Sequence, residues 1–322
     1  MSRVLVTGAT GQDGSYLVDR LIATGHDVHA MVRDAVLRGE RVPSEAVVCH
    51  AADLGEPAAV DRVIRSVAPD VVYNLGGVSS VAASWADPVT TLSVTGLAVG
   101  TILEAAWRVQ EATGREVRVV QASSAEIFAG TSEVPQSEST SIAPINPYGA
   151  AKALTMHLVD VYRRRGMFAA AGILYNHESP RRPTSFVTRK ITAAAAAIAA
   201  GAQDGLVLGD LSVRRDWGWA PDFVDALVRI ASAEAPDDFV VATGRSHSVE
   251  EFVSVAFDEV GIGDWRRYVT SDARFIRPTD AADLRGDPAK ITRELGWAPT
   301  IDFDEIVRRM VRHDLVEQHE SD

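Results

Sequence analysis

The chain has 322 residues, 46% hydrophobic and 24% charged, which is typical of a soluble globular protein that buries one large or two modest cores. Its formal net charge of -12 argues against a surface for nucleic acid or anionic membrane, although a local basic pocket for a phosphate ligand is compatible with it. The single cysteine, Cys49, excludes an internal disulfide and a thiol cluster for a metal, and the lack of a signal sequence or a long uninterrupted apolar run predicts a cytoplasmic protein.

The first half of the chain alternates between strand and helix patterns. Apolar runs that predict strands cover 3–7, 27–32, 47–50, 70–75 and 117–121. Helical spacing of apolar residues covers 15–23, 56–67 and 95–113. Strands that alternate with helices over this length predict an α/β fold with a doubly wound parallel sheet of the Rossmann type.

A glycine-rich loop separates the first predicted strand from the first helix. The glycines let the backbone approach a pyrophosphate, and the N-terminus of the helix supplies unpaired N–H groups and a positive dipole. We therefore predict a dinucleotide-binding loop, and the alternative is a turn that needs glycine only for tight packing. The loop contains Gly8, Thr10, Gly11, Gln12, Asp13 and Gly14.

Residues at other strand ends would surround the rest of the dinucleotide. Arg33 and Asp34 follow the second strand, where an arginine favours the 2′-phosphate of NADP and an acid favours NAD. We expect NADP because of Arg33, while Asp34 keeps NAD possible. Asp53 and Leu54 follow the third strand and are placed to meet the adenine, and Gly76 follows the fourth.

Four polar side chains are candidates for chemistry. Ser124 and Glu126 follow the fifth strand, and Tyr148 and Lys152 stand four residues apart on a predicted helix. A cation at that distance would lower the pKa of the Tyr148 phenol, and the set suits removal of a proton from a hydroxyl while hydride leaves the same carbon. The alternatives are a chance pair on a helix surface, a capping hydroxyl and a solvated acid.

The second half of the chain is less regular. Strand patterns cover 168–174 and 239–242, and helix patterns cover 186–201, 248–260 and 303–316. A dense polar loop at 175–183 could present histidine and arginine to phosphates. Basic residues also gather at 189–190, 214–215 and 274–277, which in an acidic protein suggests a diphosphate pocket.

Two domains are expected from this pattern. Residues 1–174 would form an NAD(P)-binding Rossmann domain, to which a late segment at about 210–245 returns. Residues 175–322 would mainly form a smaller, interleaved C-terminal α/β domain that carries the candidate diphosphate pocket.

Several motifs carry a family resemblance. The glycine loop and the Tyr148 and Lys152 pair are similar to those of the extended short-chain dehydrogenase/reductase superfamily. Within it, the segments at 176–182 and 186–191 and the residues around Arg215 resemble the GDP-mannose 4,6-dehydratase family, and the likeness spans nearly the whole chain. The resemblance implies a hydro-lyase that converts GDP-mannose to GDP-4-keto-6-deoxymannose with NADP.

The same resemblance implies roles for individual residues. The catalytic set would be Ser124, Glu126, Tyr148 and Lys152. The cofactor would contact Gly8, Thr10, Gly11, Gln12, Asp13, Gly14, Arg33, Asp53, Leu54, Leu75, Gly76, Gly77, Ser79, Tyr148, Lys152, His177 and Arg182. The substrate would contact Ser84, Asn176, Lys190, Arg215, Arg277 and Asp280, and no metal is expected.

Other functions remain open at this stage. An NAD(P)-dependent nucleotide-sugar 4-epimerase or 4-ketoreductase would need Tyr148 and Lys152 but no base for the C5 proton, so Glu126 argues against it. A non-catalytic dinucleotide-binding relative would need none of the catalytic set. Ala125 stands where the family carries a polar residue, and the loop after Arg33 is short for the family. The expected partners are a nucleotide-diphosphate sugar and further copies of the chain in a homodimer or homotetramer, with no nucleic acid and no membrane.

Overall fold

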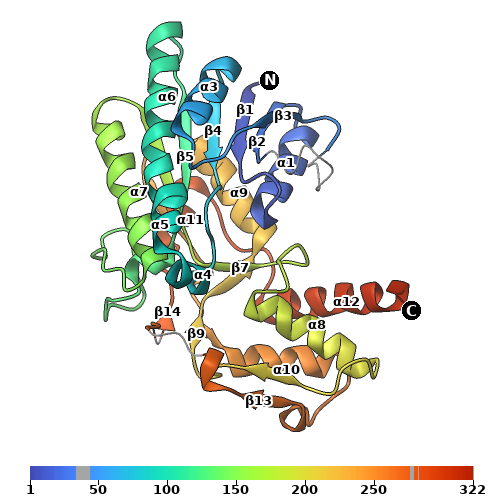
Figure 1. The fold of residues 1–322 in the computed structure, drawn as a ribbon. Coiled ribbons are helices and arrows are strands. Elements are labelled where there is room, and N and C mark those ends of the chain that lie inside the picture. Colours follow the sequence, from blue (N-terminus) through green and yellow to red (C-terminus); the bar gives the residue numbers. More distant parts are fainter. Residues whose placement is uncertain (34–43, 276–278, 282, 322) are drawn as a thin grey trace.

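The computed structural model describes residues 1–33, 44–275, 279–281 and 283–321 (Figure 1). A seven-stranded parallel sheet forms the larger part, in the order β11-β6-β5-β4-β1-β2-β3. The prediction of a doubly wound parallel sheet is confirmed. The strands are β1 (Arg3–Thr7), β2 (Asp27–Val32), β3 (Val48–Ala51), β4 (Val71–Asn74), β5 (Arg118–Ser124), β6 (Phe168–Leu174) and β11 (Asp238–Val241).

The strand order reverses at β1, which pairs with β2 on one side and with β4 on the other. In open α/β sheets, ligands bind in the crevice beyond the carboxyl ends of the strands at such a reversal. The strands are near-continuous apolar runs because both faces of the sheet are covered by helices. The fold therefore places the glycine loop after β1 and the residues after β4 and β5 at one edge.

Two layers of helices cover the sheet (Figure 1). On one face α3 packs against α6 and α6 against α7, and on the other α9 packs against α1 and α11. The bounds are α1 (Gln12–Ala23), α3 (Pro57–Val67), α4 (Val81–Ala86), α5 (Pro88–Thr91), the π-helical η1 (Leu92–Leu97), α6 (Ala98–Thr113), the 3-10 turn η2 (Ala125–Phe128), α7 (Pro147–Arg164), α9 (Ala220–Ala231) and α11 (Ala289–Leu295).

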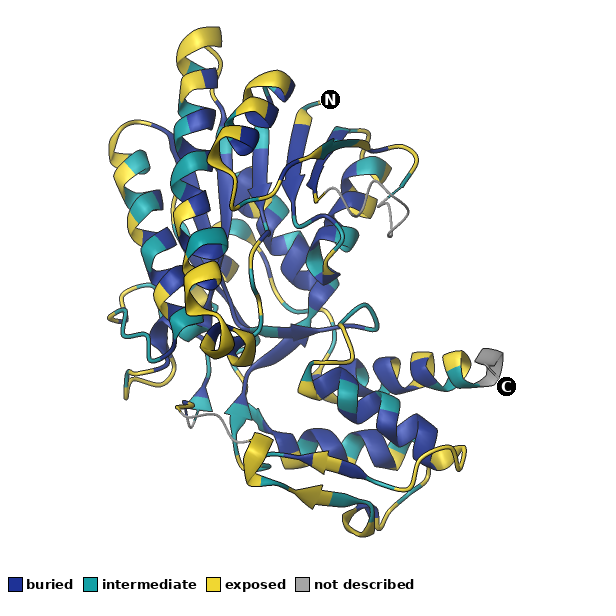
Figure 2. Ribbon diagram, viewed as in Figure 1, coloured by how far each residue is buried: buried dark blue, intermediate teal, exposed yellow. Residues whose placement is uncertain are grey.

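A second, smaller core lies below the sheet in Figure 2, where dark blue marks buried residues. It is formed by helices that pack against one another, with Phe252, Phe257 and Ile306 fully buried between them. Its helices are α8 (Val187–Ala199), α10 (Val249–Glu259) and α12 (Phe303–Ser321), with the short turns η3 (Trp265–Arg267) and η4 (Ala273–Phe275).

Short strands connect the two cores and lie at their edges. β7 (Asn176–Glu178) pairs with β10 (Trp217–Trp219), and β8 (Leu206–Leu208) pairs with β13 (Val269–Ser271). The third small sheet has β9 (Arg214–Arg215) between β12 (His247–Ser248) and β14 (Asp283–Leu284). Strands of two or three residues are too short to show a period of two, so none of them was expected from the sequence.

Late segments of the chain return to the large sheet. β11 pairs with β6, and α9 packs on β5 and β6. Helix α9 was missed in the sequence, although Pro221 stands in its first turn and Phe223, Leu227 and Ile230 follow at helical spacing on its buried face.

One helical segment, Pro88–Thr113, combines the length and apolarity of a membrane span, with a mean hydropathy of 1.4 over its best window. The expectation of no long uninterrupted apolar run is compatible with this finding, because Thr95, Thr101 and Glu104 interrupt the segment. Half of that window is buried inside the protein, and Val99, Ile102 and Leu103 are among the residues packed in the large core. We assign the segment to the core of the protein, since buried core helices can be as long and as apolar as a membrane span.

Candidate active site

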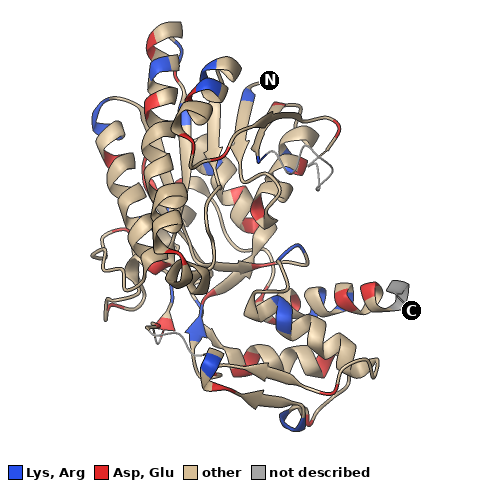
Figure 3. Cartoon of the chain, in the orientation of Figure 1, with Lys and Arg blue, Asp and Glu red and all other residues tan. Residues whose placement is uncertain are grey.

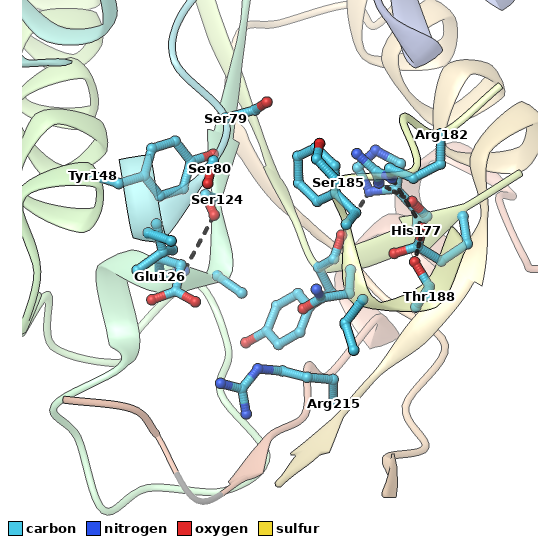
Figure 4. Close-up of a pocket in the computed structure, with 18 of the residues that line it drawn as sticks. Ser79, Ser80, Ser124, Glu126, Tyr148, His177, Arg182, Ser185, Thr188 and Arg215 are labelled. Atoms are coloured by element: carbon cyan, nitrogen blue, oxygen red, sulfur yellow. Dashed lines mark hydrogen bonds and ion pairs between the residues drawn. The ribbon is translucent and has the colours of Figure 1, made fainter. Parts of the chain in front are cut away.

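A cavity of about 640 Å³ lies between the two cores. The ends of β5 and α7 line one side of it, and the segment that follows β6 lines the other (Figure 4). Most of the residues singled out in the sequence meet here although they are far apart in the chain. The cavity is lined by Asp13, Leu75, Gly77, Ser79, Ser124, Glu126, Tyr148, Lys152, Asn176, His177, Arg182, Lys190, Arg215 and Asp280.

Helix α7 places Tyr148 in its first turn and Lys152 one turn later. Pro147 fits the first helical position because its missing N–H would have no partner there. The Lys152 ammonium is buried and donates to the carbonyl oxygen of Ala122 at 2.7 Å, and it lies 5.7 Å from the centre of the Tyr148 ring. The two side chains therefore share one face of the helix, as expected.

The expectation that Lys152 lowers the pKa of Tyr148 is not met in this structure. Burial raises the pKa of the Tyr148 phenol to about 12, and a hydrogen bond with Ser124 opposes that rise. The negative charge of Glu126 raises the pKa further. Burial also lowers the pKa of the Lys152 ammonium to about 8. The neighbour that favours the phenolate most is therefore the Ser124 hydroxyl, because the ammonium is turned toward a backbone carbonyl.

Ser124 ends β5 and begins the turn η2, which carries Glu126. The Ser124 hydroxyl oxygen accepts a hydrogen bond from the backbone N–H of Glu126 at 3.3 Å. Glu126 is half-buried and its carboxylate reaches into the cavity below Tyr148 (Figure 4). Ala125 is buried and also lines the cavity, where it presents only a methyl group. A base and a phenol thus face the same space.

The glycine loop after β1 leaves no room for side chains. Gly8 has φ +68°, and a Cβ there would lie 2.8 Å from the backbone nitrogen of Gly76. A Cβ on Gly14 would collide with the carbonyl oxygen of Gly8 and lie 2.7 Å from the Cα of Ala9. Gly11 occupies the N-cap of α1 without a side chain, so the first N–H groups of the helix are open to an anion. These residues fit a dinucleotide pyrophosphate.

Replacing Gly14 by Ala is expected to lower the free energy of unfolding by about 1–3 kcal/mol, because the added methyl group overpacks a rigid backbone. Urea unfolding measures the change. Gly263→Ala is the matched control, since a Cβ at Gly263 meets nothing within 4 Å. Equal unfolding midpoints for the two variants would contradict this account of the loop.

Gln12 has a use that the sequence did not predict. Its buried side chain donates to the carbonyl oxygen of His177 at 3.1 Å and accepts from the Ser179 hydroxyl at 2.9 Å. Arg181 adds a hydrogen bond of 3.1 Å to Ser15. These hydrogen bonds hold the start of α1 against β7 and the polar loop that follows it, some 165 residues later in the chain.

Asp13 and His177 form an ion pair at the floor of the cavity. The Nε2 atom of His177 lies 2.8 Å from the Asp13 carboxylate, and Nδ1 lies 2.7 Å from the carbonyl oxygen of Tyr175. Burial by itself raises the pKa of Asp13, but His177, with Arg182 and Gln12, more than offsets it and lowers the pKa to about 2. Asp13 is therefore ionised, and its charge lies in the first turn of α1, where the helix dipole favours it.

The Asp13 shift predicts a pH-dependent stability. A carboxyl with a folded-state pKa near 2 and a model value of 3.8 contributes about 2 kcal/mol above pH 4, and this contribution is lost as the pH falls toward 2. Asp13→Asn removes it. Urea unfolding from pH 7 to pH 3 should show the difference between the two proteins narrowing as the pH falls. A difference that stays constant over this range would contradict the ion pair.

The other residues that were expected to contact the cofactor lie at the ends of strands, as predicted. Their contacts in the structure differ from one residue to the next. A Cβ on Gly76 would lie 2.5 Å from the Leu54 side chain, and one on Gly77 would lie 2.9 Å from Thr95, so both glycines serve packing. Asp53 is exposed and accepts from the N–H of Gly55 at 2.7 Å. Arg33 is exposed at the end of β2, and Asp34 lies outside the described residues.

Basic side chains from α8 and β9 reach the cavity. Lys190 of α8 donates to the carbonyl oxygen of Val207 at 2.6 Å and lies 4.4 Å from the centre of the Phe275 ring. Arg215 is buried in β9, donates to the carbonyl oxygen of Ala281 at 2.8 Å and is paired with Asp280. Figure 3 marks the basic residues of β9 in blue, where the two cores meet. Arg277 lies outside the described residues.

Arg182 reaches the cavity from the loop after β7. Its guanidinium lies 2.9 Å from the buried carboxylate of Glu178 and also donates to the carbonyl oxygen of His177. Thr188 donates to the same carboxylate at 2.8 Å. This network holds the loop in the position drawn in Figure 4, with Arg182 on the opposite side of the cavity from Tyr148.

The placement of Ser84 in a substrate site was wrong. Ser84 is fully buried on the inner face of α4 and donates to the carbonyl oxygen of Val81 at 2.7 Å. The same helix does reach the cavity through Ser80, which caps its N-terminus, and through Trp85, whose side chain is 42% exposed. The face that a six-residue helix turns to a ligand could not be read from its sequence.

The cavity also contains hydroxyls and aromatic rings that the sequence did not single out. Ser185 lies just after the polar loop, Thr188 lies in α8, and the late turn η4 contributes Phe275. Their closeness in the sequence to the polar loop was the available signal for the first two. Over the residues described, no cluster of three or more histidine, cysteine or acidic side chains has a metal-binding arrangement.

Comparisons with known proteins agree with this site. A sequence model of the GDP-mannose 4,6 dehydratase family matches residues 5–310. The GDP-mannose 4,6 dehydratase 2 of Arabidopsis thaliana is 41% identical over 97% of this chain and 86% of its own length, and the Vibrio cholerae GDP-mannose 4,6-dehydratase is 36% identical over 97% and 94%. The solved UDP-glucose 4-epimerase of Thermus thermophilus with NAD is 26% identical, covers 97% of this chain and 98% of its own, and superposes with a TM-score of 0.84.

Proposed function

This chain belongs to the GDP-mannose 4,6-dehydratase family, and we propose that it converts GDP-mannose to GDP-4-keto-6-deoxymannose through the residues that line the cavity. The observation that carries the proposal is the meeting of Glu126 with Ser124, Tyr148 and Lys152 in one space. Ser124, Tyr148 and Lys152 would serve the oxidation of an alcohol, and loss of water from the neighbouring carbons requires an additional base.

Bound NADP would supply the acceptor for hydride from the sugar and the donor that returns it, and NAD could serve in its place. The Tyr148 phenolate oxygen takes the proton of the C4 hydroxyl as the C4–H bond breaks, which leaves a ketone at C4. Ser124 shares a hydrogen bond with that phenol, and the Lys152 ammonium contributes positive charge from the next turn of α7. Asp13 of the glycine loop, His177 and Arg182 line the cavity and would form its cofactor side.

Glu126 performs the second half of the reaction. The C4 ketone acidifies the C5 proton, the Glu126 carboxylate removes it, and the C6 hydroxyl leaves with a proton as water. Return of the hydride to C6 and of the proton held by Tyr148 to C5 would complete the reaction, so the product would be lighter than the substrate by one water. Because Ala125 offers only a methyl group, the carboxylic acid formed at Glu126 is the group placed to protonate the departing hydroxyl.

The nucleotide diphosphate would lie among Asn176, Lys190 and Arg215, with Asp280 near the base. The phosphate-binding role of Arg215 is supported because this buried side chain lines the cavity and its charge is balanced by Asp280. The remaining N–H donors of the planar guanidinium have a fixed geometry that suits a phosphate. Arg277 is proposed for the same role, and Arg33 for the 2′-phosphate.

The experiment is incubation of the purified protein with GDP-mannose and NADP, followed by mass analysis. A product lighter by one water supports the proposal. A product of unchanged mass with an inverted or oxidised C4 would instead support a 4-epimerase or a related reductase. Turnover of another sugar nucleotide with loss of water would support the dehydration reaction and contradict GDP-mannose as the substrate.

We further propose that residues 1–174, with a return at about 210–245, form the cofactor domain and that 175–322 form most of the substrate domain. The two buried cores support this division. We also propose that the protein forms a homodimer or homotetramer. A cytoplasmic location is proposed as well, supported by the burial of half of the apolar stretch within Pro88–Thr113.

A further inference from the structure

One buried side chain joins the two catalytic elements. Asn146 is 5% exposed and immediately precedes α7, which carries Tyr148. Its Nδ2 atom donates to Oε2 of Glu126 at 2.8 Å, and its Oδ1 atom accepts from the backbone N–H of Gly149 at 2.8 Å. Among the described residues, this is the hydrogen bond that the Glu126 carboxylate accepts. The amide therefore spans the space between the helix and the carboxylate.

The chemistry of the neighbours settles which way this amide points. A backbone N–H can only donate, so it requires the amide oxygen, and an ionised carboxylate can only accept, so it requires the NH₂ group. Either contact alone would fix the orientation, and both demand the same one. The helix N-terminus therefore holds the donor toward Glu126 in a single direction.

The backbone around this contact is equally confined. A Cβ on Gly149 would lie 2.6 Å from the carbonyl oxygen of Glu126, so the turn η2 and the start of α7 are packed in direct contact. The Glu126 side chain itself is half-buried and borders the cavity. Its direction thus depends on the Asn146 donor, because the backbone alone does not determine a rotamer.

We propose that Asn146 is a positioning residue that aims the Glu126 carboxylate at the C5 proton and ties it to the helix that carries Tyr148. The inference rests on the proposed function for the identity of that proton. A base that is misplaced by about 1 Å can lose roughly a hundredfold in rate, so a fixed donor has a measurable effect. A capping role for Asn146 alone would stabilise α7 without any effect specific to Glu126.

Two substitutions separate these roles. Asn146→Asp keeps a similar shape and an oxygen that caps the helix, but it presents no donor to Glu126. Asn146→Ser keeps a capping hydroxyl and is too short to reach the carboxylate. Asn146→Ala loses both contacts and reports the cost of the missing cap, about 1 kcal/mol by urea unfolding.

Two partial reactions give the readout. Exchange of the C5 hydrogen with deuterated solvent reports proton removal by Glu126, and reduced-cofactor absorbance in a single turnover reports oxidation at C4. We expect Asn146→Asp and Asn146→Ser to slow the C5 exchange by roughly ten- to a hundredfold. The C4 oxidation, KM and unfolding midpoint of Asn146→Ser should stay close to those of the unchanged protein, whereas the added charge in Asn146→Asp should also shift the pH dependence of C4 oxidation toward higher pH. Equal loss of both partial reactions, or no loss of either, would overturn the proposal.

A crystal structure of Asn146→Ser decides the question independently of the reaction. We expect the Glu126 carboxylate to occupy a different or a divided set of positions while α7 is unchanged. A single carboxylate position, identical to that in the unchanged protein, would overturn the positioning role. If the unchanged protein fails to release water from GDP-mannose, the proposed function falls, and this measurement still tests the role of Asn146.

Discussion

Tyr148→Phe is expected to slow oxidation at C4 by roughly a hundredfold to ten-thousandfold, because the phenol oxygen is the atom that takes the hydroxyl proton. Without that step the C5 proton is never acidified, so water loss should fall by the same factor. Rapid-mixing absorbance of the reduced cofactor measures the first effect, and mass analysis of the sugar nucleotide measures the second.

The chain offers a matched control on the same helix. Tyr162→Phe also removes one phenol oxygen from α7, but that hydroxyl donates to Glu104 at 2.8 Å and does not line the cavity. We expect it to leave both partial reactions unchanged. If Tyr148→Phe oxidised the sugar as fast as Tyr162→Phe does, another group would have to be the base.

Glu126→Gln is expected to divide the reaction in two. Loss of water and C5 exchange should fall by roughly a hundredfold to ten-thousandfold, whereas oxidation at C4 should persist. Because the Glu126 charge raises the pKa of Tyr148, its removal should also lower that pKa and shift the pH dependence of C4 oxidation toward lower pH. The shift adds a second, independent signature of the same carboxylate.

Glu138→Gln is the control for this substitution. Glu138 is also a partly buried acid, but its carboxylate accepts from the backbone N–H of Val240 at 2.7 Å and does not line the cavity. Its replacement should affect stability and neither partial reaction. Water loss that survives Glu126→Gln would remove Glu126 from the mechanism and reopen the epimerase and reductase alternatives.

The sequence predicted the large sheet well because its signals are local. Strands β1, β2 and β6 are mostly apolar segments of five to seven residues, and their predicted bounds match the structure. Tyr148 and Lys152 share a helix face because four residues separate them. Such spacing is set by helix geometry alone and needs no knowledge of the rest of the chain.

The electrostatics of the site could not be predicted from spacing. The Lys152 ammonium is near Tyr148, but its direction is set by the Ala122 carbonyl at the end of another element. Likewise Gln12, in the cofactor loop, is committed to His177 and Ser179 across the molecule. Ser84 failed for the same reason, since its helix turns it inward. Each of these depends on tertiary contacts that no local pattern encodes.

The return of β11 to the large sheet limits how this protein can be divided. A fragment that ended after β6 would expose the β6 edge that pairs with β11 at Ala171–Leu174, and it would uncover the apolar surface that α9 protects. Long, apolar edges of that kind recruit other chains and aggregate. Proteolytic nicking or expression of the first half alone is therefore expected to yield insoluble material. Synthesis would have to pass residue 241 before the sheet could close, so the nascent chain depends on its own late segments to stay soluble.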